Sequence, residues 1–202
     1  MDHQPASRIE RAAGLLLLLG VVASVIGVVM FQVRGGASGG LAPSADYYVW
    51  ERSLFLSAVT LTAVGFVVFA DHPNLGAGHV LARAGATAYL IGGIVGVVAE
   101  TMDLTSAAAD MYPLLVVYVV VAFLSQAALG GGLRQADLLA PWIGWTTIVW
   151  NLGWLLTLVL LTPYDVYYPV IHHVAPLLIG SALVRRTAVP RASATQAATG
   201  AR

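Results

Sequence analysis

His172 and His173 are adjacent and stand at the start of the last apolar segment of the chain, a few residues after Asp165 and Tyr168. An imidazole titrates near physiological pH and is a common metal ligand, so this pair is the first candidate for a functional site. A polar ring inside an apolar segment costs free energy unless it has a hydrogen-bonding partner. The histidines therefore require polar groups from other parts of the chain.

Three ionisable residues in other apolar segments fall at the depth predicted for the histidine pair: Glu51, Arg52 and Glu100. A charged side chain at the centre of a membrane helix costs about 2.5–3.5 kcal/mol, so each of them needs a partner or water. The sequence predicts that Arg52 binds Glu100 or Asp165 through its planar guanidinium fork. The predicted ligand-binding set is Glu51, Arg52, Glu100, Asp165, Tyr168, His172 and His173.

A catalytic metal is one interpretation of this set. Catalytic zinc takes three protein ligands and a water, and Glu51, Glu100 and His172 would supply them. The spacing argues against a metal, because consecutive residues on an α-helix point about 100° apart. Two ligands on one helix face are instead separated by about three or four residues. No metal is favoured.

No cofactor is predicted either. A haem held by two histidines needs ligands from two helices at similar depth. His79 is predicted at the inner end of the third span, on the opposite side of the membrane from His172. A quinone or a lipid headgroup lying against the tyrosines needs no second histidine and stays open.

The composition indicates that this protein folds in a lipid bilayer rather than in water. Of its 202 residues, 58% are hydrophobic and 10% are charged, whereas soluble domains carry about 25% charged residues. The formal net charge is zero, so no basic surplus exists to bind nucleic acid. The chain has no cysteine, which excludes disulfides and thiolate chemistry. The lipid bilayer is the predicted partner.

Six stretches approach the 20 or so apolar residues that a membrane span requires. They are 12–33, 49–70, 79–99, 113–130, 138–162 and 169–184. The predicted fold is an all-α, polytopic bundle of six transmembrane helices in one domain, residues 1–186, followed by a disordered cytoplasmic tail, 187–202. The first stretch is longer than a signal-peptide core, which predicts a retained anchor.

The arginines predict the orientation. With the N-terminus inside, every arginine except Arg34 and Arg52 lies on the inner side, as the positive-inside rule requires. Both termini are therefore predicted to be cytoplasmic, in a multi-pass protein of the cell membrane. The histidine pair then faces the outer leaflet.

Small residues predict the packing faces, since membrane helices associate by close approach. Ala84, Ala88, Gly92 and Gly96 recur every four residues, and Glu100 continues their stripe. Two further faces are predicted: Glu51, Phe55, Ala58, Thr62 and Gly65, and Gly144, Thr147 and Asn151. Gly130, Gly131 and Gly132 are interpreted as a break after the fourth span. A small-residue stripe also leaves a homo-oligomer possible.

The leading functional prediction is a non-enzymatic membrane protein that binds or passes a small or lipid-like ligand at a polar, aromatic-rimmed cavity in the outer leaflet. One alternative is a metal-assisted hydrolase that uses Glu51, Glu100 and a histidine. Another is a structural subunit of a larger assembly, in which the same polar residues form only a stabilising network.

Overall fold

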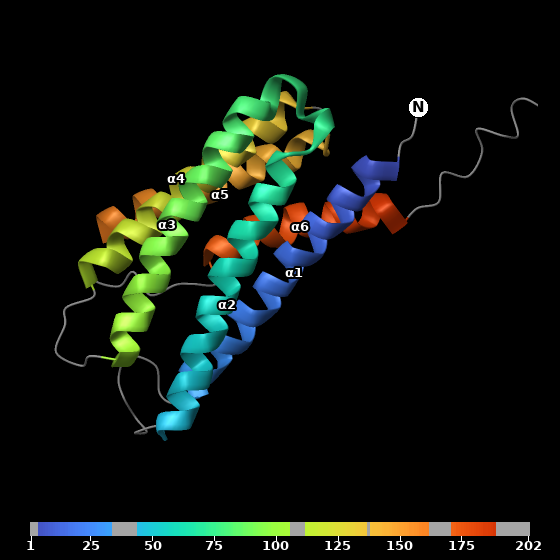
Figure 1. Ribbon diagram of the computed structural model, residues 1–202. Helices are drawn as coiled ribbons and strands as arrows, with labels where there is room; N and C mark the ends of the chain where they lie inside the picture. Colours follow the sequence, from blue (N-terminus) through green and yellow to red (C-terminus); the bar gives the residue numbers. More distant parts are fainter. Residues whose placement is uncertain (1–3, 34–43, 106–111, 137, 162–170, 189–202) are drawn as a thin grey trace, which may run out of the picture.

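The structure is a computed structural model that describes residues 4–33, 44–105, 112–136, 138–161 and 171–188, and all regular structure in these ranges is helical (Figure 1). The α-helices are α1 (Gln4–Val33), α2 (Ala45–Ala70), α3 (His79–Thr105), α4 (Tyr112–Gln135), α5 (Pro141–Leu161) and α6 (Val174–Ala188). Two 3₁₀ helices, η2 (Pro73–Gly78) and η3 (Ile171–His173), precede α3 and α6. The predicted all-helical class is confirmed for the described residues.

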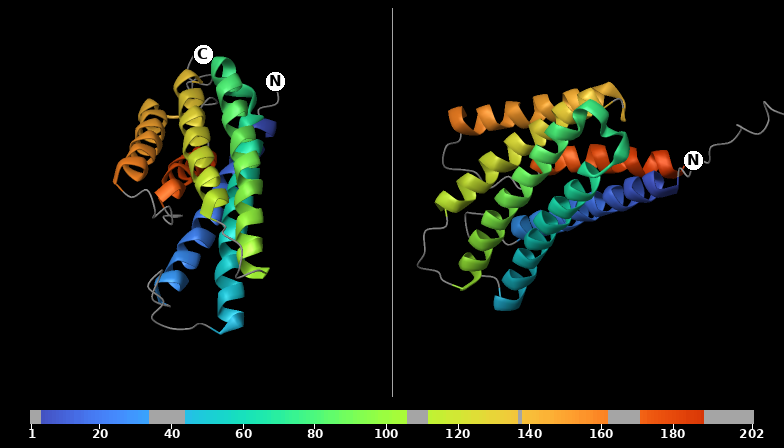
Figure 2. Two further views of the ribbon diagram at one scale, coloured as in Figure 1. Left: turned by 90° about the vertical axis from the view of Figure 1, so that its left-hand side faces the viewer. Right: turned by 45° about the horizontal axis from the view of Figure 1, so that its top comes forward.

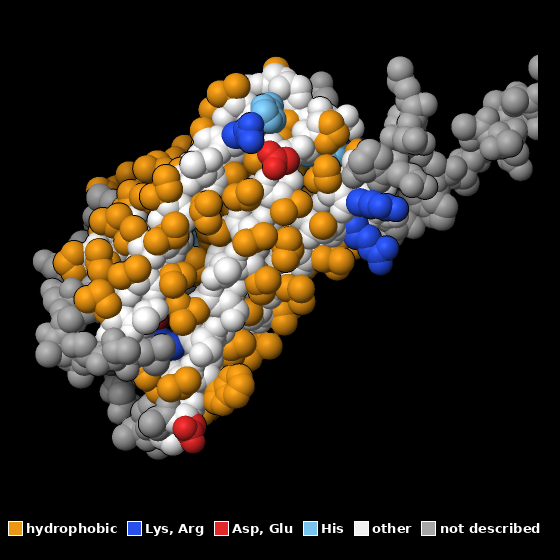
Figure 3. Space-filling model, in the orientation of Figure 1, with side chains coloured by type: hydrophobic (Ala, Val, Ile, Leu, Met, Phe, Trp, Pro, Cys, Tyr) orange, Lys and Arg blue, Asp and Glu red, His pale blue; other side chains and the backbone are white. Residues whose placement is uncertain are grey.

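Four of these helices, α1 to α4, are long and apolar enough to cross a membrane. Hydrophobic side chains cover most of the visible flank of the molecule, and charged groups lie toward its ends (Figure 3). Such a flank suits contact with hydrocarbon, where every backbone polar group must be satisfied within the helix. By length and composition, these four helices are candidate membrane spans.

From α1 to α5, each helix packs beside the next one in the chain, whereas α6 lies along α1 (Figures 1 and 2). Three elements meet at one end of the bundle: the start of α1, the 3₁₀ helix η2 and the end of α6. There Glu10 lies 3.3 Å from His72 and 3.6 Å from Arg186. We call it the Glu10 end. The opposite end joins the starts of α2 and α4, the end of α3 and η3, and we call it the His172 end.

The core between these ends is built from buried aromatic and aliphatic side chains. Phe66 and Tyr89 pack edge to face, with ring centroids 5.1 Å apart, and Phe69, Phe123 and Leu17 are fully buried. In lipid such packing stabilises the fold by close contact between helices rather than by removal of apolar surface from water. The core thereby fixes the register of the polar residues at both ends.

The predicted break at Gly130–Gly132 is wrong, because α4 continues through all three glycines to Gln135. A Cβ atom on Gly132 would lie 2.9 Å from the backbone oxygen of Gly78, and one on Gly130 would lie 2.8 Å from that of Gly144. The glycines therefore allow η2 and α5 to approach the backbone of α4. Their role is close packing within the helix, not chain reversal.

The last predicted span is displaced. Helix α6 begins at Val174 and reaches Ala188, so the histidine pair lies in η3 rather than in the α-helix. Helix α1 begins at Gln4, eight residues before the predicted start. Pro169, the predicted first helical residue, lies outside the described residues, as does most of the predicted tail.

The glycine stripe on α3 is confirmed only in the half nearer the His172 end. A Cβ atom on Gly92 would meet Val121 at 2.7 Å and one on Gly96 would meet the Tyr118 ring at 2.9 Å, so both face α4. Ala84, by contrast, is exposed. A step of four residues turns an α-helix by about 400°, so a stripe at this spacing drifts by about 40° per step. Glu100 lies at the end that points inward.

Candidate functional site

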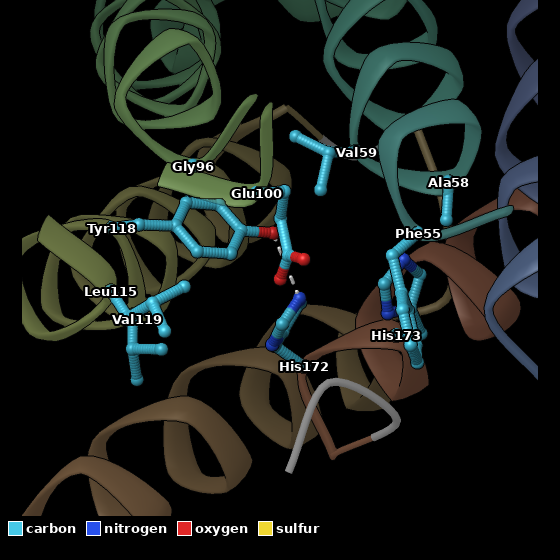
Figure 4. Close-up of a pocket in the computed structure, with 10 residues that line it drawn as sticks. All are labelled: Phe55, Ala58, Val59, Gly96, Glu100, Leu115, Tyr118, Val119, His172 and His173. Atoms are coloured by element: carbon cyan, nitrogen blue, oxygen red, sulfur yellow. Dashed lines mark hydrogen bonds between the residues drawn. The ribbon is translucent and has the colours of Figure 1, made fainter. Parts of the chain in front are cut away.

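A cavity of about 40 Å³ lies at the His172 end, where α2, α3, α4 and η3 meet (Figure 4). The residues that line it are Phe55, Ala58, Val59, Gly96, Glu100, Leu115, Tyr118, Val119, His172 and His173. A water molecule occupies about 30 Å³ in the liquid, whereas pockets for whole drug-sized ligands span about 300–1,000 Å³. The cavity therefore fits a water molecule or the polar end of a larger ligand.

An ion pair closes one side of the cavity. The Nη1 atom of Arg52 donates to Oε2 of Glu100 at 2.7 Å, and the two side chains are only 7% and 12% exposed. The guanidinium also lies 3.8 Å from Glu51 and 4.9 Å from the centre of the Tyr48 ring. The predicted Arg52–Glu100 pair is thus confirmed, and it ties the start of α2 to the end of α3.

His172 forms the opposite wall. Its Nε2 atom lies 3.1 Å from the hydroxyl of Tyr118, and its ring packs edge to face against Tyr118 and Phe123. The side chain is almost fully buried, and within the described part of the chain its Nδ1 atom has no hydrogen-bond partner. A buried nitrogen without a partner costs about 1–3 kcal/mol. This nitrogen is therefore a place where water or a ligand would be stabilised.

The two histidines do not point apart as the sequence predicted. Their ring centroids are 4.7 Å apart and the planes are tilted by 34°, with both side chains buried. The prediction assumed a continuous α-helix, in which neighbouring side chains leave on different faces. Because η3 is a single 3₁₀ turn before α6, that assumption fails and both rings turn into the bundle.

Five of the seven predicted site residues gather at the His172 end. Glu51 lies behind Arg52 and does not line the cavity, whereas Glu100, His172 and His173 do. The remaining two, Asp165 and Tyr168, lie outside the described residues. The gathering of these groups is a finding, while their role in ligand binding stays a prediction.

Tyr118 is the lining residue that the sequence reading missed. It is the only residue with a hydroxyl in the apolar run 113–124, and an isolated polar group in such a run is the signal that could have identified it. Its hydroxyl lies close to that of Tyr89, which in turn lies close to Thr62. Tyr89 and Thr62 make no hydrogen bond of standard geometry within the described residues.

The metal interpretation receives no support from the side-chain geometry. Within the described ranges, no group of three or more His, Asp or Glu side chains is placed to hold a metal ion. Arg52 contacts both Glu51 and Glu100, so a guanidinium occupies the position between the two carboxylates that a cation would take. The absence of a cofactor stays a prediction.

A second polar cluster lies at the Glu10 end. The backbone N–H of Asn74 donates to Nδ1 of His72 at 3.2 Å, which caps η2, and Nε2 of the same ring lies 3.3 Å from the Glu10 carboxylate. Burial lowers the pKa of His72 despite the opposing effect of Glu10, and Arg186 lowers it further. The neutral ring, with its proton on Nε2, fits these contacts.

The cavity at the His172 end can hold a hydrogen-bonding group between Tyr118, His172 and Glu100, which converge in Figure 4. It contains no serine, threonine or cysteine nucleophile among its lining residues. The polar groups that it does contain are those of Glu100, Tyr118, His172 and His173, set among apolar side chains. Comparison of the chain with protein-family models, curated proteins and solved structures finds no match.

Proposed function

We propose that this chain is a six-span protein of the cell membrane that binds or passes a small or lipid-like ligand at the cavity of the His172 end. In this proposal α5 and α6 complete the bundle begun by the four longer helices. At 1.5 Å per residue, the 21 residues of α5 extend about 31 Å, close to the thickness of a hydrocarbon core. The 15 residues of α6 and the 3₁₀ turn before it extend about 28 Å.

The orientation proposed for the bundle places the Glu10 end in the cytoplasm. Arg8, Arg11, Arg185 and Arg186 belong to the helix ends that meet there, and an excess of arginine favours the cytoplasmic side. The chain start and the end of α6 are then both cytoplasmic. The cavity with His172 lies at the level of the outer leaflet.

The observation that carries the proposed function is the Nδ1 atom of His172, which has no hydrogen-bond partner among the described residues and belongs to a buried ring that lines a cavity. Natural proteins satisfy nearly all of their buried polar groups. A hydrogen-bonding group that reached the Nδ1 edge of the ring, which lies on the side away from Tyr118 and Glu100 (Figure 4), would remove this penalty. The apolar lining from Phe55, Val59 and Leu115 would at the same time favour an apolar neighbour to that group.

The ligand proposed is uncharged at its polar end. Among the described residues that line the cavity, Glu100 is the only acidic one, and Arg52 already binds it. A second charge in this buried space would lose its hydration without gaining an unpaired counter-ion. A hydroxyl or carbonyl group meets the donors and acceptors of Tyr118 and His172 without that cost.

The experiment is native mass spectrometry of the purified protein, which reports small molecules retained from the membrane. We expect a stoichiometric uncharged amphiphile on the wild type and its loss from Tyr118→Phe and His172→Gln. Ser125→Ala is the matched control, because it removes a buried hydroxyl from the same helix as Tyr118, one that bonds to the Ala122 backbone oxygen and does not line the cavity. Retention by that control would separate ligand contact from general loss of stability.

Other outcomes would favour the alternatives. A stoichiometric protein partner, with no retained small molecule, would favour a structural subunit. A retained divalent metal that is lost on replacement of Glu51 would favour the hydrolase. Equal retention of the amphiphile by Tyr118→Phe and the wild type would contradict the proposed site.

A further inference from the structure

A groove of about 280 Å³ runs along the seam between α2 and α3, on the flank of the bundle. Its lining residues are Val59, Thr60, Ala63, Val64, Leu90, Gly93, Ile94, Val97 and Val98. The only hydroxyl among them, that of Thr60, donates to the backbone oxygen of Leu56 at 2.8 Å. The groove therefore offers an aliphatic surface without an unsatisfied polar side chain.

The groove adjoins the polar cavity. Val59 lines both of them, and a Cβ atom on Gly93 would lie 3.2 Å from Cγ1 of Val59. The side chain of Val59 thus lies beside both spaces, with Gly93 facing it from α3. Helices α2 and α3 also pack less extensively than α1 with α2 or α3 with α4.

The two spaces follow each other along the bundle axis. The cavity lies near the start of α2 and the end of α3, whereas the groove runs along 59–64 of α2 and 90–98 of α3, nearer the middle of both helices. With the His172 end in the outer leaflet, polar groups lie outward and aliphatic groups lie toward the bilayer centre. A lipid of the outer leaflet has the same order.

We infer that the groove holds the aliphatic tail of an uncharged, single-tailed amphiphile whose polar head enters the cavity beside Tyr118 and His172. This inference rests on the proposed function and adds the class of ligand and its route, which is lateral from the membrane between α2 and α3. The size of the cavity supports it, because about 40 Å³ accepts a head but not a tail. The tail must then lie elsewhere, and the adjoining groove is aliphatic.

The test uses a photoreactive hexadecanol that carries a diazirine and an alkyne in its chain, added to the protein in lipid nanodiscs. Cross-linked peptides are mapped by mass spectrometry with and without excess unlabelled hexadecanol. We expect competed labelling within 59–64 and 90–98. Gly93→Leu, which fills the groove, should weaken labelling there about tenfold, the effect of losing roughly two buried methylene groups.

Gly153→Leu is the matched control, because a Cβ atom at Gly153 on α5 meets nothing within 4 Å. It makes the same substitution on a different lipid-facing helix and should leave the competed labelling unchanged. If Gly93→Leu does not fold, the positions of competed labelling on the wild type test the inference by themselves. Hexadecylamine and palmitate in place of the alcohol test the charge of the head, and stronger competition by either would overturn the uncharged head.

The remaining outcomes separate this inference from the proposed function. Competed labelling at the cavity residues 115–119 without labelling of the groove would overturn the lateral groove and leave the proposed function standing. Competed labelling absent from both regions would overturn both. Labelling of the groove that excess hexadecanol does not reduce would identify ordinary bilayer contact and would also overturn the inference.

Discussion

Arg52 and Glu100 connect the start of α2 to the end of α3 through a 2.7 Å hydrogen bond from Nη1 to Oε2, and both side chains are nearly buried. The two residues are 48 positions apart in the sequence. The pair therefore fixes the spacing of two helices that pack less closely than their neighbours. It also holds the Glu100 carboxylate against the wall of the cavity.

The first prediction concerns this ion pair. Arg52→Leu leaves Glu100 buried beside no guanidinium, and removing one partner of a buried pair costs about 3–5 kcal/mol. We expect a large fall in the thermal unfolding midpoint in detergent. The double variant Arg52→Leu/Glu100→Leu should recover part of the loss, because the Glu100 charge is removed while the buried Glu51 carboxylate, 3.8 Å from Arg52 in the wild type, remains.

The exposed pair Arg83–Asp71 is the control for this measurement. Its atoms lie 3.3 Å apart, but the side chains are 61% and 60% exposed, and such pairs contribute about 0–1 kcal/mol. Arg83→Leu should change the midpoint little. Similar losses for Arg52→Leu and Arg83→Leu would show that burial does not strengthen the Arg52 pair.

The second prediction uses the three glycines of α4. Gly132→Ala should destabilise the protein by about 1–3 kcal/mol, the range for overpacking, because its Cβ atom would lie 2.9 Å from backbone atoms of Gly78 and Ala82. Gly131→Ala should be neutral or stabilising by up to about 1 kcal/mol, since alanine favours a helix and only the end of the Leu81 side chain lies nearby. Thermal unfolding of both variants measures the difference. Equal effects at the two positions would mean that these glycines lie in a loop, as their sequence suggests.

These glycines show where sequence reasoning reaches its limit. Hydropathy locates helices well, because a run of about 20 apolar residues usually forms a membrane helix. The positions of α2 and α3 follow from such runs. Three consecutive glycines, however, read as a turn unless the backbone that approaches them is known. Gly78 lies 54 residues away from Gly132 in the sequence, and no local sequence pattern predicts that the two residues are in contact.

Only part of the candidate site could be predicted from the sequence. Arg52 and Glu100 could be paired from the sequence, because a charge in an apolar segment must find an opposite charge. Tyr118 was not selected, because a tyrosine near a membrane interface has an ordinary role as an anchor. The closeness of the two histidine rings was missed because it depends on η3, and a 3₁₀ turn has no distinctive residue pattern. The start of α6 and the direction of the two histidine rings can be known only from the tertiary structure.

The third prediction tests the orientation. Single cysteines introduced at Ser38 and Ala107 should react with a membrane-impermeant maleimide from outside intact cells, whereas cysteines at Ala77 and Ala194 should react only after the membrane is opened. The chain contains no native cysteine, so background labelling is absent. External reaction at Ala77, which lies in η2 at the Glu10 end, would reverse the proposed orientation.

The last prediction concerns pH and His72. Burial lowers the pKa of this ring below its ordinary value of 6.5, so the folded chain binds fewer protons than the unfolded chain as the pH falls below that value. Unfolding then takes up protons, and the free energy of unfolding falls with decreasing pH. The stabilising contribution is complete above about pH 6.5 and is lost as the pH falls toward the pKa of the folded state. Unfolding in detergent across about pH 7.5 to 5.5 measures it.

Substitution with asparagine isolates this effect. Asparagine is a good helix-capping residue and can accept the Asn74 N–H as the imidazole does, but it does not titrate. His72→Asn should therefore keep the stability found at high pH and lose the part of the decline that His72 contributes, while the other buried histidines, His172 and His173, remain. The same change at His79, which follows η2 directly, is the control and should leave that decline intact. If His72→Asn shows the full wild-type decline, the contacts of His72 with Glu10 and Asn74 are not the origin of the pH dependence.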